Sequence, residues 1–177
     1  CDEDGQPVSL PEDFYSARDI VDKMIDYLDE ADPEKPFFSY LSVMAVHVPV
    51  QVPRDYVDKY DGVFDRGWDV MRQERLDRAI TLGLVPETTA LRPPLDSNRD
   101  WDSLGADEKV YWARAMQVNA GMMEAADFHL GRLLRHLQDN GQLDNTIVVV
   151  TSDNGPEYNT LGKTAPPALR AFERTWM

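Results

Sequence analysis

The sequence predicts an α/β fold, and three observations support this prediction. A β-branched run from Thr146 to Thr151 and an aromatic, apolar run at residues 37–44 each have the length and composition of an interior strand. An amphipathic helical pattern precedes each of these runs, at residues 16–31 and at residues 107–140. Helices and strands that alternate along a chain are typical of a layered α/β sheet with parallel pairing.

The first helix is expected to begin at Tyr15-Ser16. Ser16 is its predicted N-cap, and Asp19 follows three residues later as an acidic variant of the capping box. Asp32-Pro33 ends the helix, because the residue before a proline disfavours helical geometry. The apolar positions of this helix share one face: Ile20, Val21, Met24, Tyr27, Leu28 and Ala31.

The strand at residues 37–44 leads into a loop stiffened by Pro49 and Pro53, which bar further pairing inside a sheet. A short helix is predicted after Pro53, and a second, strongly charged helix over residues 66–82. Residues 83–105 contain three prolines and little periodicity, so an irregular surface excursion is expected there.

The long helix is expected to end at Asn140-Gly141. His129 and His136 lie off its apolar seam, which predicts that both are at the surface. The predicted seam consists of Met116, Ala120, Met123, Leu130, Leu134 and Leu137. Two strands do not make a sheet, since small α/β domains have about four or more. Either further strands escape this pattern or they lie in sequence outside this chain.

Length and charge narrow the function classes. A chain of 177 residues can bury a core and is expected to form one domain. The net charge of −14 argues against a nucleic-acid or anionic-membrane binder, because both use an excess of Lys and Arg. No apolar run is long enough to span a bilayer, and the single cysteine, Cys1, excludes an internal disulfide. An anionic substrate would need a bound cation to reverse the local field.

The sequence Asp153-Asn154-Gly155 is the first candidate site. It follows a β-branched run, and it offers a carboxylate and an amide oxygen side by side, with a glycine that permits a sharp turn. Hard divalent cations such as calcium bind such oxygens. The alternative interpretation is an ordinary tight turn, because Asp-Asn-Gly is common in turns.

His47 is the second candidate. It lies between valines in the proline-stiffened loop, and it would emerge at the same sheet edge as Asp153 if the two strands are parallel neighbours. An imidazole there could donate to an anionic oxygen or protonate a leaving group. The alternative is a structural histidine. Lys163 could meet an anionic substrate, but it is equally consistent with a loop lysine.

An ordered series of stretches resembles type I sulfatases, the arylsulfatase branch of the alkaline-phosphatase-like superfamily. Residues 14–156 carry this similarity best, and residues 157–177 carry it weakly. The matching stretches are Phe14-Tyr15-Ser16, Asp22-Lys23, Lys35 to Leu41, His47-Val48-Pro49, Gln51, Pro53, Tyr56 to Tyr60, Arg72 to Arg75, Met116 to Met123, Gly131-Arg132, Asp144-Asn145-Thr146 and Ser152 to Gly155.

The resemblance implies part of an α/β/α sandwich with a large mixed sheet, and hydrolysis of sulfate esters. It implies a calcium ion, less often magnesium, with Asp153 and Asn154 as two of its ligands. It also implies that His47 hydrogen-bonds the sulfate ester near the leaving oxygen. The nucleophile of the family is a formylglycine made from a Cys/Ser-x-Pro-x-Arg motif.

This chain lacks that motif, and it also lacks the family's two other metal-binding aspartates. Residues 1–177 are therefore interpreted as an interior segment of a sulfatase catalytic domain, with formylglycine expected in the N-terminal part that is absent here. The chain alone is expected to be inactive and to self-associate through exposed sheet edges. Two alternatives stay open: a phosphodiester or phosphonate monoester hydrolase of the same superfamily, and a non-catalytic acidic module that binds calcium or a protein.

Overall fold

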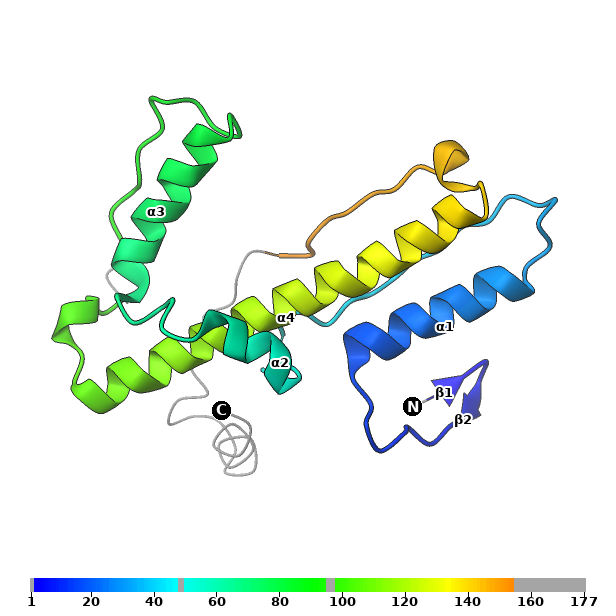
Figure 1. Cartoon of the computed structure of the whole chain (residues 1–177), viewed down its shortest axis with the longest axis horizontal. Coiled ribbons are helices and arrows are strands. Elements are labelled where there is room, and N and C mark those ends of the chain that lie inside the picture. Colours follow the sequence, from blue (N-terminus) through cyan, green and yellow to red (C-terminus); the bar gives the residue numbers. More distant parts are fainter. Residues whose placement is uncertain (1, 48–49, 95–97, 155–177) are drawn as a thin grey trace.

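A computed structural model describes residues 2–47, 50–94 and 98–154, and this part of the chain is mainly helical (Figure 1). The hairpin strands β1 and β2 pair antiparallel, with Asp2 opposite Pro7. In chain order the elements are β1 (Asp2–Glu3), β2 (Gln6–Pro7), α1 (Ser16–Glu30), α2 (Arg54–Val57), η1 (Asp58–Tyr60), α3 (Gly67–Thr81), η2 (Trp101–Ser103), α4 (Ala106–Asp139) and η3 (Leu143–Asn145), where η marks a 3-10 helix.

The predicted helices are confirmed, with one correction at the start of α1. The N-cap is Tyr15, whose backbone is extended, and Ser16 is already helical. The prediction was wrong by one residue because the Asp19 carboxylate fixes the first turn: its Oδ2 accepts a hydrogen bond of 2.8 Å from the Tyr15 backbone N–H. The acidic capping contact therefore forms, but it accepts the backbone N–H of Tyr15, the residue before the predicted cap.

Helices α1 and α4 pack side by side and run in the same direction (Figure 1). Two ion pairs show the direction: Asp22 bonds Arg132 at 2.6 Å, and Asp29 further along α1 bonds His136 further along α4, at 3.1 Å. Each helix is followed by an extended segment, at residues 37–44 and 146–152, that runs back along α4 against the direction of that helix (Figure 1). The two extended segments therefore run in the same direction.

The buried face of α4 differs from the predicted seam. Met123 is 58% exposed and Leu134 is 36% exposed, whereas His129, predicted at the surface, is only 7% exposed. The reason is the close approach of α1 and α2, which favours small side chains at the contact and leaves larger apolar ones at its margins. The buried residues of α4 are Ala113, Gln117, Val118, Gly121, Met122, Ala125, Ala126, His129 and Leu137.

Residues 61–105 form an excursion that contains α3 and is closed at its base by aromatic packing. Trp101 packs edge-on against Trp68, with ring centroids 4.9 Å apart. The Trp68 indole N–H donates to the Arg99 carbonyl at 3.1 Å, and the Trp101 backbone N–H donates to Asp69 at 3.1 Å. These contacts join the two ends of the excursion to each other, and Trp112 at the start of α4 packs on the same cluster. The positions of both ends of the excursion are therefore fixed relative to α4.

The two predicted strands are not formed, and this corrects the sequence analysis. Across residues 2–47, 50–94 and 98–154 the only sheet is the small β1–β2 hairpin near the N-terminus. Phe38 is 91% exposed and Ile147 is 92% exposed. A strand exists only through hydrogen bonds to a neighbouring strand, and neither segment has one here. The layers of an α/β/α sandwich are therefore not assembled in the described part, although its helices are.

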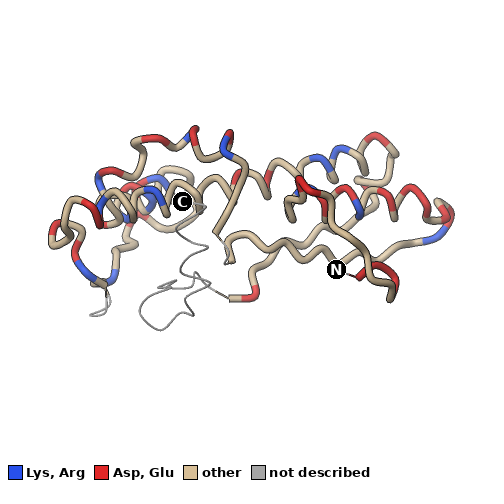
Figure 2. The backbone as a smooth tube through the Cα atoms, turned by 90° about the horizontal axis from the view of Figure 1, so that it is seen from below, with Lys and Arg blue, Asp and Glu red and all other residues tan. Residues whose placement is uncertain are grey.

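Charge is distributed unevenly over the described part. Neither extended segment contains Lys, Arg, Asp or Glu, whereas many acidic residues lie on the helices (Figure 2). No helix in this part has the length and apolar character needed to cross a membrane. Lys163 and the weak helical pattern after Glu157 lie outside the described residues.

Candidate functional site

His47 ends a four-residue turn that closes the extended segment 37–44. Its backbone N–H donates to the Met44 carbonyl at 2.8 Å. Ala45 and Val46, inside this turn, pack against a buried cluster formed by α2 and α4, while the His47 residue itself is exposed. The turn therefore presents an imidazole to solvent from a backbone that is anchored to the helices.

The anchoring cluster consists of Val57 from α2 and Val118 and Met122 from α4, all at least 95% buried. Val50 and Val52, which follow the turn, pack on the same cluster. Apolar residues on both sides of His47 are thus held by one core, which gives the alternating valines of the loop a packing role. The proline-stiffened loop predicted from the sequence is ordered by this contact where the structure describes it.

Asp153 and Asn154 lie at the end of the second extended segment, and both are exposed. The Asn154 backbone N–H donates to the Asp153 side chain at 2.9 Å, and the Ser152 hydroxyl donates to the Asn154 carbonyl at 2.6 Å. These local bonds form the sharp turn that both interpretations of the sequence required. Gly155, the next residue, lies outside the described part.

The donor chemistry of this turn suits a hard divalent cation, because carboxylate and amide oxygens are its preferred ligands. Two adjacent residues do not complete a site, since calcium takes about six to eight oxygens. Among the described residues no cluster of three or more His, Cys, Asp or Glu side chains could hold a metal ion. Asp153 and Asn154 by themselves therefore offer only part of such a ligand set.

The ends of the two extended segments lie beside the middle of α4 (Figure 1). This arrangement follows from the parallel course of α1 and α4, because each helix sends its following segment back in the same direction. His47 and Asp153 follow the corresponding ends of these two segments, and their placement at one shared site stays a prediction. Their joint action on one substrate stays a prediction.

Sequence reasoning missed a polar joint between α1 and α4, centred on the buried His129. Arg132 donates to the Nδ1 atom of His129 at 3.1 Å and also pairs with Asp22. Since Arg can only donate, Nδ1 must be the acceptor of a neutral imidazole. Burial, aided by the positive charge of Arg132, lowers the pKa of His129 and keeps the ring neutral. Spacing along the sequence carried no signal for this joint, because Asp22 and Asp29 are seven residues apart whereas their partners Arg132 and His136 are four apart.

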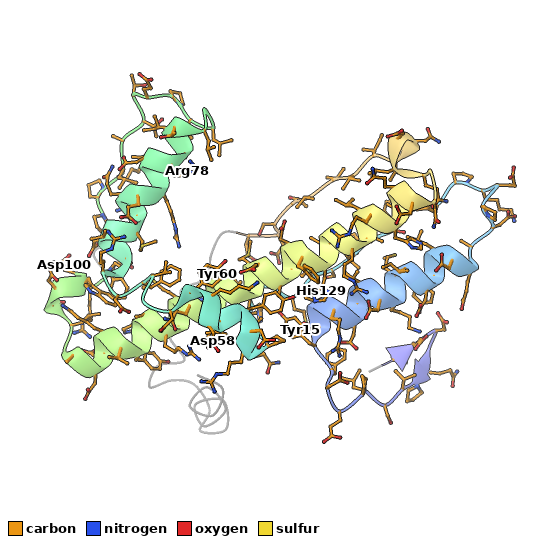
Figure 3. All side chains as sticks on the ribbon, in the orientation of Figure 1. Tyr15, Asp58, Tyr60, Arg78, Asp100 and His129 are labelled. Atoms are coloured by element: carbon orange, nitrogen blue, oxygen red, sulfur yellow. The ribbon has the colours of Figure 1, made fainter. Side chains whose placement is uncertain are left out.

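Tyr15 covers the other side of this joint (Figure 3). Its ring centroid lies 6.4 Å from that of His129. Burial, together with the nearby Tyr56, raises the pKa of Tyr15 to about 12, so its phenol stays protonated at neutral pH. These contacts give the joint a structural role in holding α1 on α4, and they leave His47 as the exposed histidine of the described residues.

A surface hollow of about 310 Å³ lies at the far ends of α1 and α4, away from His47 and Asp153. Its charged groups are already paired, because Asp32 bonds Lys35 at 3.0 Å and Asp29 bonds His136. The hollow therefore offers no unpaired charge to an anionic ligand, and it does not compete with the candidate site.

Comparison with known protein families shows to which family this chain belongs. The sulfatase family profile matches residues 2–172. This chain belongs to the sulfatase family. The match supports the resemblance read from the ordered stretches of sequence, and it implies the α/β fold of that family, of which the described residues supply helices and two extended segments. Sulfatases are generally metal-dependent, which agrees with the oxygen donors at Asp153 and Asn154.

Three curated relatives illustrate the match. An uncharacterized sulfatase of Schizosaccharomyces pombe is 41% identical over 150 residues, covering 84% of this chain and 27% of the relative. An arylsulfatase of Klebsiella aerogenes is 30% identical over 175 residues, covering 98% of this chain and 38% of the relative. An arylsulfatase of Clostridium perfringens is 26% identical over 166 residues, covering 92% and 31%. The chain thus spans about a third of the length of these relatives.

Proposed function

We propose that this chain contributes to the hydrolysis of sulfate esters, as the part of a sulfatase that carries one substrate-binding histidine and two metal ligands. The family match over residues 2–172 carries this proposal. The arylsulfatase names of two of the relatives support an aryl sulfate as the test substrate. The turns at His47 and at Asp153-Asn154 are the places where the described residues offer the required chemistry.

His47 is assigned to the substrate. Its ring is exposed on an anchored turn, so an imidazole N–H can donate to a sulfate ester oxygen without reorganisation of the backbone. Placed near the bridging oxygen, the same group can stabilise or protonate the departing alcohol or phenol. Residues 36–52 and 146–152 contain no charged side chain, so they do not themselves repel the anionic substrate.

Asp153 and Asn154 are assigned to a divalent cation, calcium or magnesium. When bound, such an ion supplies positive charge that offsets the sulfate oxygens and the net charge of −14 of the chain. The role of the two residues is to hold oxygen donors at the end of the segment, in the turn fixed by the Ser152 hydroxyl. The nucleophile, a formylglycine in this proposal, comes from outside the 177 residues.

The test compares variants of the longest polypeptide that the gene encodes, assayed with an aryl sulfate and excess calcium. We expect His47→Ala to lower kcat by about 10²–10⁴, the range for loss of a proton-transferring side chain. In a separate calcium titration, Asp153→Ala should need a higher calcium concentration than the wild type to reach the same activity. His136→Gln is the matched control, because this histidine pairs with Asp29 at the far end of α4.

Two results would overturn the assignment. One is turnover of an aryl sulfate by the 177-residue chain alone at a rate well above its His47→Ala variant, since the chain lacks the nucleophile motif. The other is faster hydrolysis of a matched aryl phosphate or phosphonate ester than of the aryl sulfate, which would favour the phosphodiester or phosphonate hydrolase alternative. A polypeptide that binds calcium but hydrolyses none of these esters would favour the non-catalytic module.

A further inference from the structure

The backbone that follows His47 touches α4 at a glycine. A Cβ atom added to Gly121 would lie 3.1 Å from Val52 Cγ1, 3.2 Å from the Tyr56 carbonyl carbon and 3.3 Å from Tyr56 Cβ. All three distances are tighter than ordinary van der Waals contact, and one of the atoms belongs to the backbone, which cannot rotate away. Gly121 is buried and has helical geometry, so neither solvent exposure nor an unusual φ explains a glycine there.

A glycine in the middle of a helix costs about 1 kcal/mol relative to alanine. Its benefit at position 121 is the close approach of residues 52–57 to the helix axis. On either side of this contact lie Val118 and Met122, the two α4 residues of the cluster that holds Val46 and Val50. The distance between α4 and residues 52–57 therefore determines the position of the turn that carries His47.

A second contact fixes the same unit at its other end. Lys59, directly after α2, pairs with Glu124 of α4 and lies over the Tyr56 ring, 5.0 Å from its centroid. The loop and α2 are thus tied to α4 at Gly121 and at Glu124, with the buried Val57 between them. Extra volume at position 121 cannot be relieved by sliding along the helix and must lift the loop from it.

We propose that Gly121 is a positioning residue for His47: its missing side chain sets how closely the loop that carries the imidazole sits on α4, and so where that imidazole meets the sulfate ester. This inference rests on the assignment of His47 to the substrate. Displacements well below 1 Å at a catalytic group have kinetic consequences, since about 1 Å of misplacement can lower a rate by about a hundredfold.

The test is Gly121→Ala in the longest polypeptide that the gene encodes, with Gly131→Ala as the matched control. Gly131 lies on the same helix, and an added Cβ would meet only the flexible end of Arg135, at 3.8 Å. Both substitutions bring the same gain in helix propensity. We expect Gly121→Ala to lower kcat toward an aryl sulfate about tenfold with little change in KM, and Gly131→Ala to leave both unchanged.

Hydrogen–deuterium exchange gives a readout that does not depend on activity. Amide exchange over residues 44–57 should accelerate in Gly121→Ala and not in Gly131→Ala, because the His47 and Tyr56 N–H groups both bond within the lifted segment. Adding Val52→Ala to Gly121→Ala removes the nearest contact and should recover part of kcat. If Gly121→Ala does not fold, Val52→Ile adds volume at the same contact from the loop side and should give the same two effects.

Equal kcat and equal exchange in Gly121→Ala and Gly131→Ala would overturn the inference. A lower kcat without faster exchange over residues 44–57 would overturn it too, because the effect would not pass through the loop. The two failures are distinguishable. If the wild-type polypeptide hydrolyses no sulfate ester, the proposed function is refuted. If Gly121→Ala then still exchanges faster over residues 44–57, its role in positioning the loop is supported.

Discussion

Helix α4 and the two extended segments each carry a row of apolar side chains, but they differ in what covers those side chains. On α4 the apolar face is buried by α1, by α2 and by the tryptophans at the base of the excursion. On residues 146–150 the apolar side chains stand in solvent, with Val149 79% exposed and Val150 82% exposed. A helix satisfies its own backbone hydrogen bonds, whereas a strand depends on neighbours. The helices are therefore formed in the described residues, whereas residues 37–44 and 146–152 do not form strands.

The difference also separates two kinds of contribution to function. The helices fix positions, through the valine cluster behind His47 and the polar joint around His129. The extended segments carry the candidate chemistry at their ends, at His47 and at Asp153. The position of the His47 turn is thus set by the helices, through the cluster of Val57, Val118 and Met122.

The largest expected effect is a loss of stability in the helical region on substitution of Gly67. This residue has φ +79°, and an added Cβ would lie 2.1 Å from Trp101 Cδ2. Gly67→Ala should lower the free energy of unfolding by about 3 kcal/mol or more, since it combines a left-handed backbone with overpacking. Gly83→Ala, at φ +69° with nothing within 4 Å, should cost only the backbone share of about 1–2 kcal/mol. Urea denaturation of the chain measures both, and equal losses would mean that the Trp101 contact is not rigid.

The next effect concerns the extended segments. Exposed, uncharged, β-branched residues favour pairing between copies, so the 177-residue chain should self-associate. Replacing Ile147 and Val149 by lysine should shift it toward monomer in sedimentation velocity experiments. Val110→Lys is the control, because Val110 is 71% exposed on α4 and lies outside any extended segment. A wild-type chain that is monomeric at high concentration would show that these segments are covered within one copy.

A smaller effect sharpens the description of the α1–α4 joint. The pKa of His129 in the folded chain lies below its unfolded value of about 6.5. Between these two values the unfolded chain binds more protons, so the contribution of His129 to stability is complete above about pH 6.5 and is lost as the pH falls. The charged groups that face the ring are Arg132 on its own helix and Arg18, Asp19 and Asp22 on α1.

Melting temperatures of the wild type and of His129→Gln, measured between pH 7.5 and 5.5, test this expectation. The wild type should lose more stability than the variant on acidification, and each kcal/mol corresponds to about 2–4 °C for a chain of this size. Parallel curves for the two proteins would show that the ring is not held neutral by the joint.

The smallest effect concerns the metal ligands. With two of its ligands present, the chain should bind calcium with a Kd of about 1 mM or weaker, because affinity follows ligand number and charge. Isothermal titration calorimetry measures this, with Asp153→Asn as the control that removes the charge. Micromolar binding lost in Asp153→Asn would mean that further ligands join the site; micromolar binding retained in that variant would place the site elsewhere.

Local patterns predicted what depends on local structure. The ends of α1 and α4 followed from Asp32-Pro33 and Asn140-Gly141, and the start of α1 was predicted to within one residue, because these signals act within a few residues. The strands did not follow from equally clear patterns, since pairing needs a partner that composition cannot supply. His129 was misplaced for a related reason: its burial depends on α1, more than 100 residues earlier in the chain. An ordered loop was predicted at His47, and it is held there by the cluster of Val57, Val118 and Met122. The turn predicted at Asp153-Asn154-Gly155 is described only as far as Asn154, and the joint role of His47 and Asp153 stays a prediction.

The closed base of the excursion has a consequence for how such proteins diversify. Because Trp68, Arg99 and Trp101 hold the two ends of the excursion together, we expect changes in length between Thr81 and Arg99 to leave the packing of α2 on α4 unchanged. Members of the family could therefore acquire new sequence at this outer tip over evolution, while the histidine turn keeps its position relative to the long helix.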